Sequence, residues 1–374
     1  MKKYYSLFVV TFLFSKLGIS LEIESSGDIV NLYDSNPTTL MKAGADIKNW
    51  SHLNCELDKS KLKKTPSAGA MPDEWFIDVA QCIPDKIKKY LNVNPSQDGP
   101  NCWNFALYSK EIISSLRFTT PDEMSFFTDS PLCKKIGNLN EVLPGDIGAI
   151  RKVRQLKNGS KILEEKHGFI VVSKDIAFTK NGLDKRKPYS ISTMEDVFKE
   201  YDVKNYEQCF LGKGKLPLGC NDIYSFFRCD SMKSYVEKNK NIPSYIFIGL
   251  RYLNVVQDSL ENAVIKAEFG YNNADDPGNS DYNKAIKNFN DFFFNFFLTS
   301  LNKENRINEA TLFILDSMQV QMLAIASQGK LGTDHILKNR FLEYSKSLTE
   351  ATLNYFTRNK KGSSKSNLTS KSKN

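Results

Sequence analysis

The chain has 374 residues, of which 41% are hydrophobic, 12% aromatic and 25% charged. This composition excludes collagenous, coiled-coil and wholly disordered chains, and the length is sufficient for two compact cores. The formal charge of +8 is concentrated at the two ends, because residues 1–20 carry three lysines and residues 358–374 carry six basic residues, with no acid in either segment. The remainder is nearly neutral, which argues against nucleic acid as a partner, since nucleic-acid readers concentrate positive charge on a folded face.

The first twenty residues have the pattern of a secretory signal peptide. Two lysines near the start precede a short apolar run over residues 7–14, and small residues stand three and one positions before Leu21. The run is about half the length that a membrane-spanning helix needs. We therefore expect an exported protein, periplasmic or extracellular, without a transmembrane segment; a buried N-terminal helix is the alternative.

Polar and turn-forming residues dominate residues 21–70, so we expect a loosely structured lead-in there. Over residues 73–93 apolar residues recur at steps of three to four, which predicts a helix. A loop rich in glycine and proline, 94–101, then leads to Cys102. An apolar stripe over residues 103–116 predicts a second helix that begins at this cysteine.

Short β-strands are predicted beyond this helix, each bounded by turn-forming residues. They cover residues 147–153, 168–173 and 176–179, with further candidates at 189–192 and 245–250. A helix that carries a cysteine at its start and is followed by an antiparallel sheet is an α+β pattern. We place this domain at residues 71–250.

Helical patterns dominate the rest of the chain, which we read as an all-helical domain over residues 251–358. The predicted helices cover residues 251–268, 281–301, 304–328 and 334–358. Six phenylalanines lie between Phe289 and Leu298, too many for a surface helix, so this segment is expected in the core of a bundle. Lysine, serine and asparagine dominate residues 359–374, which predicts a disordered basic tail.

Seven cysteines follow the expected signal: Cys55, Cys82, Cys102, Cys133, Cys209, Cys220 and Cys229. Because an exported protein pairs its cysteines and seven is odd, we expect three disulfides and one free thiol, with Cys102 as the candidate. Proximity suggests one bridge among the last three cysteines and another among Cys55, Cys82 and Cys133. A zinc site is the alternative, but the short pairs typical of zinc modules are missing, so we expect no metal.

Cys102 and His167 are the candidate nucleophile and base. Unpaired backbone N–H groups at a helix N-terminus stabilise an anion, which lowers the pKa of a thiol placed there. Nucleophilic catalysis by cysteine also needs a base, normally histidine. Of the three histidines, His52 lies in the polar lead-in and His335 in the helical part. Only His167 opens a predicted strand of the sheet.

Three motifs occur in order around these residues. They are Asn-Cys-Trp-Asn-Phe-Ala-Leu at 101–107, Leu-Pro-Gly-Asp-Ile-Gly at 143–148 and His-Gly-Phe-Ile-Val-Val at 167–172. This set resembles the NlpC/P60 and CHAP superfamily of papain-like cysteine hydrolases, over roughly residues 95–200. The resemblance implies a papain-like domain that hydrolyses an amide bond in peptidoglycan peptides through a thioester, without a metal or organic cofactor.

The resemblance also implies a third polar residue, on the next strand, that orients the histidine. Strand alternation places Thr179 and Asn181 on one face and Lys180 on the other. We expect Asn181 to accept a hydrogen bond from the Nδ1–H of His167. The alternative is that Asn181 and the glycine after it form a turn.

An oxyanion hole is expected beside the cysteine, formed by the backbone N–H of Cys102 with a side-chain amide from Gln97 or Asn101. Asp146 is expected to be a structural turn residue. The Asn-Cys-Trp-Asn start departs from the Asp-Cys-Ser-Gly or Gln-Cys start frequent in the family, and the helical region has no counterpart there. A second hypothesis is therefore an inactive exported binding or scaffold protein of the same fold. Acyl transfer or cleavage of a protein partner is a third.

Overall fold

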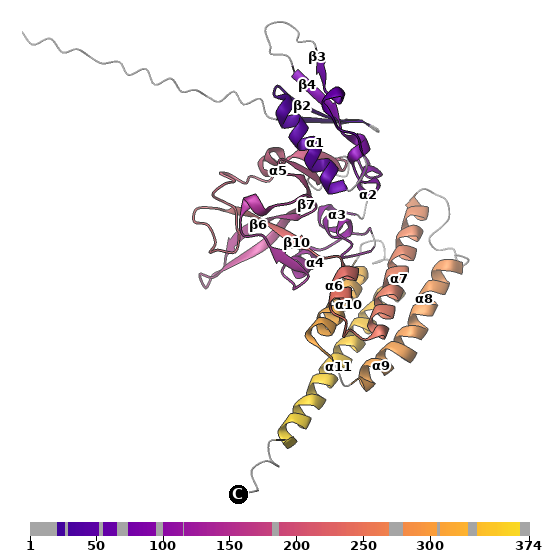
Figure 1. The fold of residues 1–374 in the computed structure, drawn as a ribbon. Helices are drawn as coiled ribbons and strands as arrows, with labels where there is room; N and C mark the ends of the chain where they lie inside the picture. Colours follow the sequence, from indigo (N-terminus) through magenta and orange to yellow (C-terminus); the bar gives the residue numbers. More distant parts are fainter. Residues whose placement is uncertain are drawn as a thin grey trace, which may run out of the picture.

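The computed structural model (Figure 1) describes most of the chain after residue 20. The described residues are 21–26, 29–51, 55–65, 74–94, 100–114, 116–181, 187–268, 280–304, 307–327 and 335–366. The expected signal peptide, Gln97 and residues 367–374 lie outside them. The described part has an α+β architecture with two antiparallel sheets and a C-terminal group of helices. None of its helices combines the length and the apolar character needed to cross a membrane.

Three of the four strands of the first sheet lie in the segment expected to be a loose lead-in, so that expectation was wrong. Its strand order is β1 (Glu22–Ser26), β2 (Ile29–Asp34), β4 (Glu74–Asp78) and β3 (Lys63–Thr65). Helix α1 (Pro37–Ser51) packs between this sheet and β7 of the second sheet. Only alternate residues of β2, such as Val30 and Leu32, are buried. The polar composition of residues 21–70 as a whole therefore did not indicate that the segment forms a sheet.

The predicted helix over residues 73–93 was also wrong. Strand β4 occupies its start, followed by a 3₁₀ turn at Ala80–Cys82 and the single-turn helix α2 (Asp85–Lys88). Trp75 and Phe76 pair with β2 in the ladder, and Pro84 separates the 3₁₀ turn from α2. The recurrence of apolar residues every three to four positions therefore arose here from a strand, a 3₁₀ turn and a single-turn helix.

The second sheet has the order β5–β10–β6–β7–β8–β9, with every pair antiparallel. Its strands are β5 (Cys133–Lys135), β6 (Ile147–Gln155), β7 (Lys161–Ser173), β8 (Ile176–Thr179), β9 (Ser190–Thr193) and β10 (Asp222–Cys229). The strands predicted within residues 147–192 are confirmed. The sequence did not predict β10, which lies between β5 and β6, and residues 245–250 are helical instead of a strand.

Four short helices accompany this sheet: α3 (Cys102–Ser109), α4 (Pro121–Thr128), α5 (Met194–Glu200) and α6 (Met232–Lys238). Helix α3 packs on β7 and β8, and α5 packs against β8 and β9. Helix α3 is shorter than predicted because the chain turns at Glu111, whose φ of 56° lies in the left-handed region.

The C-terminal helices follow the predicted order and contain one irregular turn. They are α7 (Ser244–Glu268), α8 (Ser280–Phe292), a π-helical segment (Phe293–Leu298), α9 (Thr299–Lys303), α10 (Glu309–Ala326) and α11 (His335–Ser366). Helix α11 continues past residue 358 into the segment expected to be disordered. In the π-helical segment Phe293 and Phe297 are fully buried, whereas Phe294 and Phe296 are 44% and 46% exposed.

One hydrophobic core joins the second sheet to these helices. It combines residues such as Leu107 of α3 and Ile147 of β6 with Phe297 and Tyr344 of the C-terminal helices. The rings of Phe126 in α4 and Phe313 in α10 stack across the junction at 6.0 Å. The C-terminal helices therefore share a core with the sheet, whereas the sequence suggested a domain of their own.

Three disulfides form, and Cys102 is free, as the odd number of cysteines predicted. Cys55–Cys82 and Cys209–Cys220 each lie within one of the two groups of three cysteines in which proximity suggested a bridge, although the sequence did not specify the pairs. The third bridge, Cys133–Cys229, joins residues that face each other across β5 and β10 at the edge of the second sheet.

Candidate functional site

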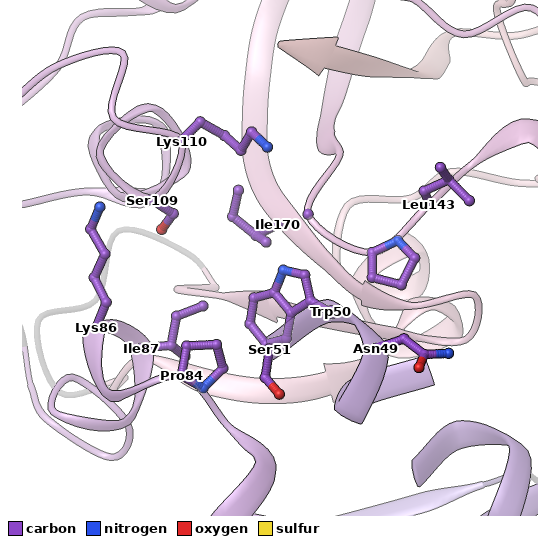
Figure 2. Close-up of a pocket in the computed structure, with 12 residues that line it drawn as sticks. Asn49, Trp50, Ser51, Pro84, Lys86, Ile87, Ser109, Lys110, Leu143 and Ile170 are labelled. Atoms are coloured by element: carbon purple, nitrogen blue, oxygen red, sulfur yellow. The ribbon is translucent and has the colours of Figure 1, made fainter. Parts of the chain in front are cut away.

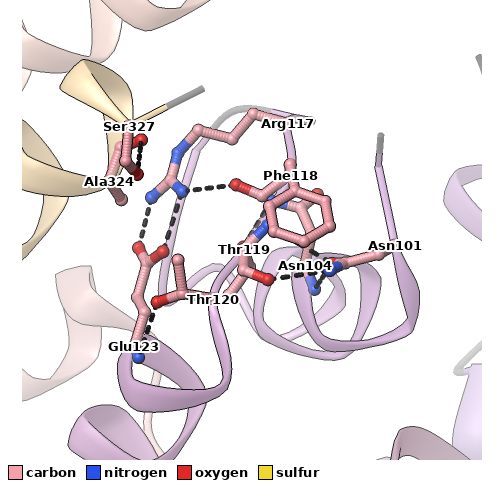
Figure 3. Close-up of polar contacts among 9 residues, drawn as sticks. All are labelled: Asn101, Asn104, Arg117, Phe118, Thr119, Thr120, Glu123, Ala324 and Ser327. Carbon is pink, nitrogen blue, oxygen red and sulfur yellow. Dashed lines mark hydrogen bonds and ion pairs between the residues drawn. The ribbon is translucent and has the colours of Figure 1, made fainter. Parts of the chain in front are cut away.

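Cys102 is the first residue of α3, the place predicted for a nucleophile. Asn101 caps the helix: its side-chain oxygen accepts a hydrogen bond from the Asn104 N–H at 3.0 Å. Its amide nitrogen donates to the carbonyl of Thr119 at 2.7 Å (Figure 3). The described geometry thus makes Asn101 a helix cap that fixes Cys102, whereas we expected its amide to serve an oxyanion hole.

A buried ion pair fastens the loop between α3 and α4. Arg117 and Glu123 are 6% and 1% exposed, and their side chains form two hydrogen bonds, of which Arg117 Nη1 to Glu123 Oε2 measures 2.9 Å. Arg117 also donates to the carbonyl of Phe118 at 3.1 Å (Figure 3). The pair therefore helps to hold Thr119 in place, where Asn101 donates to its carbonyl and Asn104 donates to its hydroxyl oxygen.

The thiol of Cys102 is surrounded by protein, although part of the residue reaches the surface. Burial raises the pKa of this thiol to about 11, because it removes water from the thiolate. The backbone N–H groups of Gly168 and Trp103 and the charge of Lys180 act in the opposite direction, but less strongly. We expected the helix N-terminus to lower the pKa; desolvation outweighs it here, so the resting thiol is neutral.

His167 in β7 is fully buried and is held through Nε2. This nitrogen lies 2.6 Å from the hydroxyl oxygen of Thr179, and that hydroxyl donates to the side-chain oxygen of Asn181 at 3.2 Å. We expected Asn181 to bind the ring directly and through Nδ1; Thr179 stands between the two residues and binds the other nitrogen. The predicted placement of Thr179 and Asn181 on one face agrees with this chain of hydrogen bonds.

The hydrogen bond from Thr179 to Asn181 indicates the tautomer of the ring. Because the Thr179 hydroxyl donates to Asn181, its oxygen accepts the Nε2–H of His167. Nδ1 then carries a lone pair, and it is buried without a hydrogen-bond partner among the described residues. Burial, with a smaller contribution from Lys180, lowers the pKa of His167 to about 3, so the ring is neutral.

Cys102 and the His167 ring approach β7 from different sides. Gly168 faces α3, since a Cβ at this position would lie 3.0 Å from Cδ1 of Trp103. The imidazole stacks on Tyr201, just beyond α5, with ring centroids 4.0 Å apart, and also lies against Phe169. No hydrogen bond joins the thiol to the ring within the described residues. The structure therefore brings together His167, Thr179 and Asn181, and places the thiol at the adjacent Gly168.

Two residues near the site were not assigned a role from the sequence. Lys180 is buried and its charge reaches both the thiol and the imidazole. The sequence offered one indication of its position, since strand alternation placed Lys180 on the face opposite Thr179. Tyr201 follows α5 in a loop, and nothing in the sequence indicated that it would cover the histidine. Asp146 is buried and binds Arg228 and the Leu143 N–H, the structural turn role predicted for it.

No protein-family model matches the chain, and comparisons with curated proteins and with solved structures gave no match. The class of site is therefore defined by its geometry. A free cysteine begins a helix that packs on β7 of an antiparallel sheet. The same strand holds a neutral histidine, with Nε2 bound to Thr179 and Nδ1 buried without a hydrogen-bond partner among the described residues.

Proposed function

We propose that the protein is an exported cysteine hydrolase that cleaves an amide bond with Cys102 and His167. One observation carries this function: the Thr179–Asn181 chain holds Nε2 of His167 and leaves the lone pair of Nδ1 buried and unused. A structural histidine in a core normally has partners for its polar atoms. A general base instead needs one nitrogen oriented and the other open to a proton.

The reaction follows from these positions. The thiol lies at Gly168 and has to come within reach of Nδ1 before His167 can take its proton; the sulfur then attacks the substrate carbonyl. The backbone N–H of Cys102 is a donor for the oxyanion. Collapse of the tetrahedral intermediate gives a thioester, and His167 returns the proton to the leaving amine. Water then attacks the thioester, His167 accepts a proton from it, and the carboxylic acid leaves with the thiol restored.

Peptidoglycan peptides are the substrate class favoured by the resemblance of the three motifs to NlpC/P60 and CHAP hydrolases. An exported location agrees with this substrate. It is supported by the signal-like start of the sequence and by the three disulfides, since disulfides persist in oxidising compartments.

An inactive binding or scaffold protein of the same fold is the second candidate. It is favoured by the pKa of Cys102, which burial raises to about 11, and by the absence of a hydrogen bond between the thiol and His167 within the described residues. A thiol of this kind is mostly protonated at neutral pH and reacts slowly with electrophiles.

The test uses purified protein, the Cys102→Ala variant and the His167→Gln variant, each incubated with purified peptidoglycan sacculi. Mass spectrometry should find peptide fragments with the unsubstituted protein, none with Cys102→Ala, and a rate lowered about 10²- to 10⁴-fold with His167→Gln. Fragments that persist in Cys102→Ala would contradict the proposed nucleophile.

Alkylation by iodoacetamide at neutral pH separates the candidates if no fragments appear. A reactive Cys102 would support the hydrolase proposal but exclude peptidoglycan as the substrate. An unreactive Cys102 in the folded protein would favour the binding protein.

A further inference from the structure

A cavity of about 540 Å³ opens at the C-terminal end of α3, and neither Cys102 nor His167 lines it (Figure 2). Its lining comes from the end of α1, from α2, from the end of α3, from the turn before β6 and from β7: Asn49, Trp50, Ser51, Pro84, Lys86, Ile87, Ser109, Lys110, Leu143, Pro144, Gly145 and Ile170. Helix α3 has eight residues, so roughly 12 Å of helix separates this cavity from the thiol.

Apolar side chains form most of the cavity wall. Ile87 and Pro84 lie on one side, Leu143 on the other, and Ile170 of β7 between them (Figure 2). A cavity of this volume with an apolar lining and few polar groups has the ordinary character of a small-molecule site.

Two hydrogen-bond donors converge in this apolar space. A Cβ built on Gly145 would lie 3.2 Å from Nε1 of Trp50 and 3.7 Å from Nζ of Lys110, so both nitrogens lie beside the same point of the turn. Figure 2 shows them directed toward the middle of the cavity. Among the described residues, neither nitrogen has a hydrogen-bond or ion-pair partner. Gly145 has a φ of 85° and no side chain, which leaves this space open.

The acids near Lys110 already have cations of their own. Asp146 pairs with Arg228 through contacts of 2.9 and 3.0 Å, and Asp230 pairs with Lys238 at 2.7 Å. Lys86, at the rim, contacts Glu111 at 3.4 Å. Desolvation lowers the pKa of Lys110, and the two nearby aspartates offset only part of that effect. Lys110 is thus a half-buried cation that lacks a direct counter-ion within the described residues.

We propose that this cavity binds a small carboxylate with an apolar body. The carboxylate accepts hydrogen bonds from Lys110 Nζ and Trp50 Nε1, and the apolar body lies against Ile87 and Ile170. A free organic acid and the C-terminus of a peptide that ends in an apolar residue present the same chemistry. The site is independent of Cys102 and of the proposed hydrolysis.

Isothermal titration of the purified protein tests this with two probe pairs: 4-phenylbutyrate and its amide, and a tripeptide that ends in phenylalanine with a free or an amidated C-terminus. We expect at least one acid to bind and its amide to bind far more weakly. The acid that binds identifies whether the site takes free acids or peptide ends. Absence of binding by both acids, or equal binding of acid and amide, would overturn the proposal.

Three variants locate the binding. Lys110→Met should weaken binding of the acid about 10- to 100-fold, because a hydrogen bond to a charged group is lost. Trp50→Phe keeps an aromatic ring but removes the N–H donor, and should weaken binding of the acid about 5- to 10-fold. Lys233→Met is the control, since Lys233 of α6 is an exposed lysine outside the cavity lining; it should change affinity less than about twofold. An unchanged affinity in a folded Lys110→Met variant would contradict the assigned site.

Discussion

The sheet-bearing part of the chain and its C-terminal helices are stabilised by different interactions. The three disulfides lie between Cys55 and Cys229, in the part that also buries the ion pairs Arg117–Glu123 and Arg151–Glu165. From α7 onward the sequence has no cysteine. There the fold depends on apolar packing. Aromatic rings contact each other both within one helical segment, as Phe289 and Phe293 do, and between helices, as Phe293 and Tyr344 do.

The comparison shows how one molecule can combine a cross-linked half with a half that has no cross-links. Reduction removes covalent constraints only from the sheet-bearing part. The shared core nevertheless couples the two parts, since Leu107 and Ile147 belong to the same cluster as Phe293 and Tyr344. Loss of packing in the helices should therefore destabilise the sheet as well.

The largest expected effect is in the helical region. Phe293→Ala empties a fully buried position and should lower the free energy of unfolding by about 3–5 kcal/mol. Because the core is shared, tryptophan fluorescence and far-UV circular dichroism should shift together in a urea titration. Phe294→Ala is the matched control: its ring is 44% exposed, so its cost should be well below that of Phe293→Ala. Separate transitions for the two signals would show that the regions unfold independently.

The next largest effect on stability is expected at the ion pair between Arg117, in the loop after α3, and Glu123 of α4. Glu123→Gln leaves the guanidinium of Arg117 buried without its counter-charge and should cost about 3 kcal/mol. The double variant Arg117→Met/Glu123→Met removes both charges and should be the more stable of the two. Thermal unfolding of both proteins measures this difference, and the reverse order would contradict a buried pair.

The smallest effect, taken per pH unit, is the change in the free energy of unfolding with pH that arises at His167. Its folded-state pKa of about 3 lies below the usual value near 6.5, so the unfolded chain takes up the proton first. The stabilisation is complete above pH 6.5 and is lost as the pH falls toward 3, by at most about 1.4 kcal/mol per pH unit. Urea titrations across this range should show the slope, and His167→Gln should lack it.

That control also separates His167 from Glu165. Burial raises the pKa of Glu165 to about 7, which gives a contribution of opposite sign that both proteins retain. If the unsubstituted protein and His167→Gln have the same pH dependence, the imidazole is not protected from protonation in the folded state.

Local patterns in the sequence predicted the centre of the fold and the identity of the free cysteine. The run Phe169 to Val172 and the turn residues around it were sufficient for the strands, and the odd cysteine number was sufficient for Cys102. Residues 245–250 were read as a strand because a short apolar run fits a buried strand and a buried helix equally well. Only the tertiary packing of α7 decides between them.

The chemical state of the site depends on contacts between distant segments and was not predictable. The thiol pKa is raised because α3 packs closely on β7 at Gly168, and the ring of His167 is covered by Tyr201 from beyond α5. The cavity near Lys110 likewise needs four further segments to meet at the end of α3. The sequence supplied the candidate residues, whereas their burial arises from long-range packing.

The shared core also has a consequence for the order in which the chain acquires its structure during synthesis. Leu107 and Tyr344 belong to one cluster but are about 240 residues apart in the sequence. At about 5–20 residues per second, a ribosome needs roughly 12–50 s to bridge that interval. Until the helices α7 to α11 are made, in turn, the apolar side chains of Leu107, Phe127 and Ile147 lack their partners in this core. The nascent sheet therefore lacks part of its core until the last helix is made, and a chain that stops before α11 would lack the contribution of Phe341, Tyr344 and Leu348 to that core.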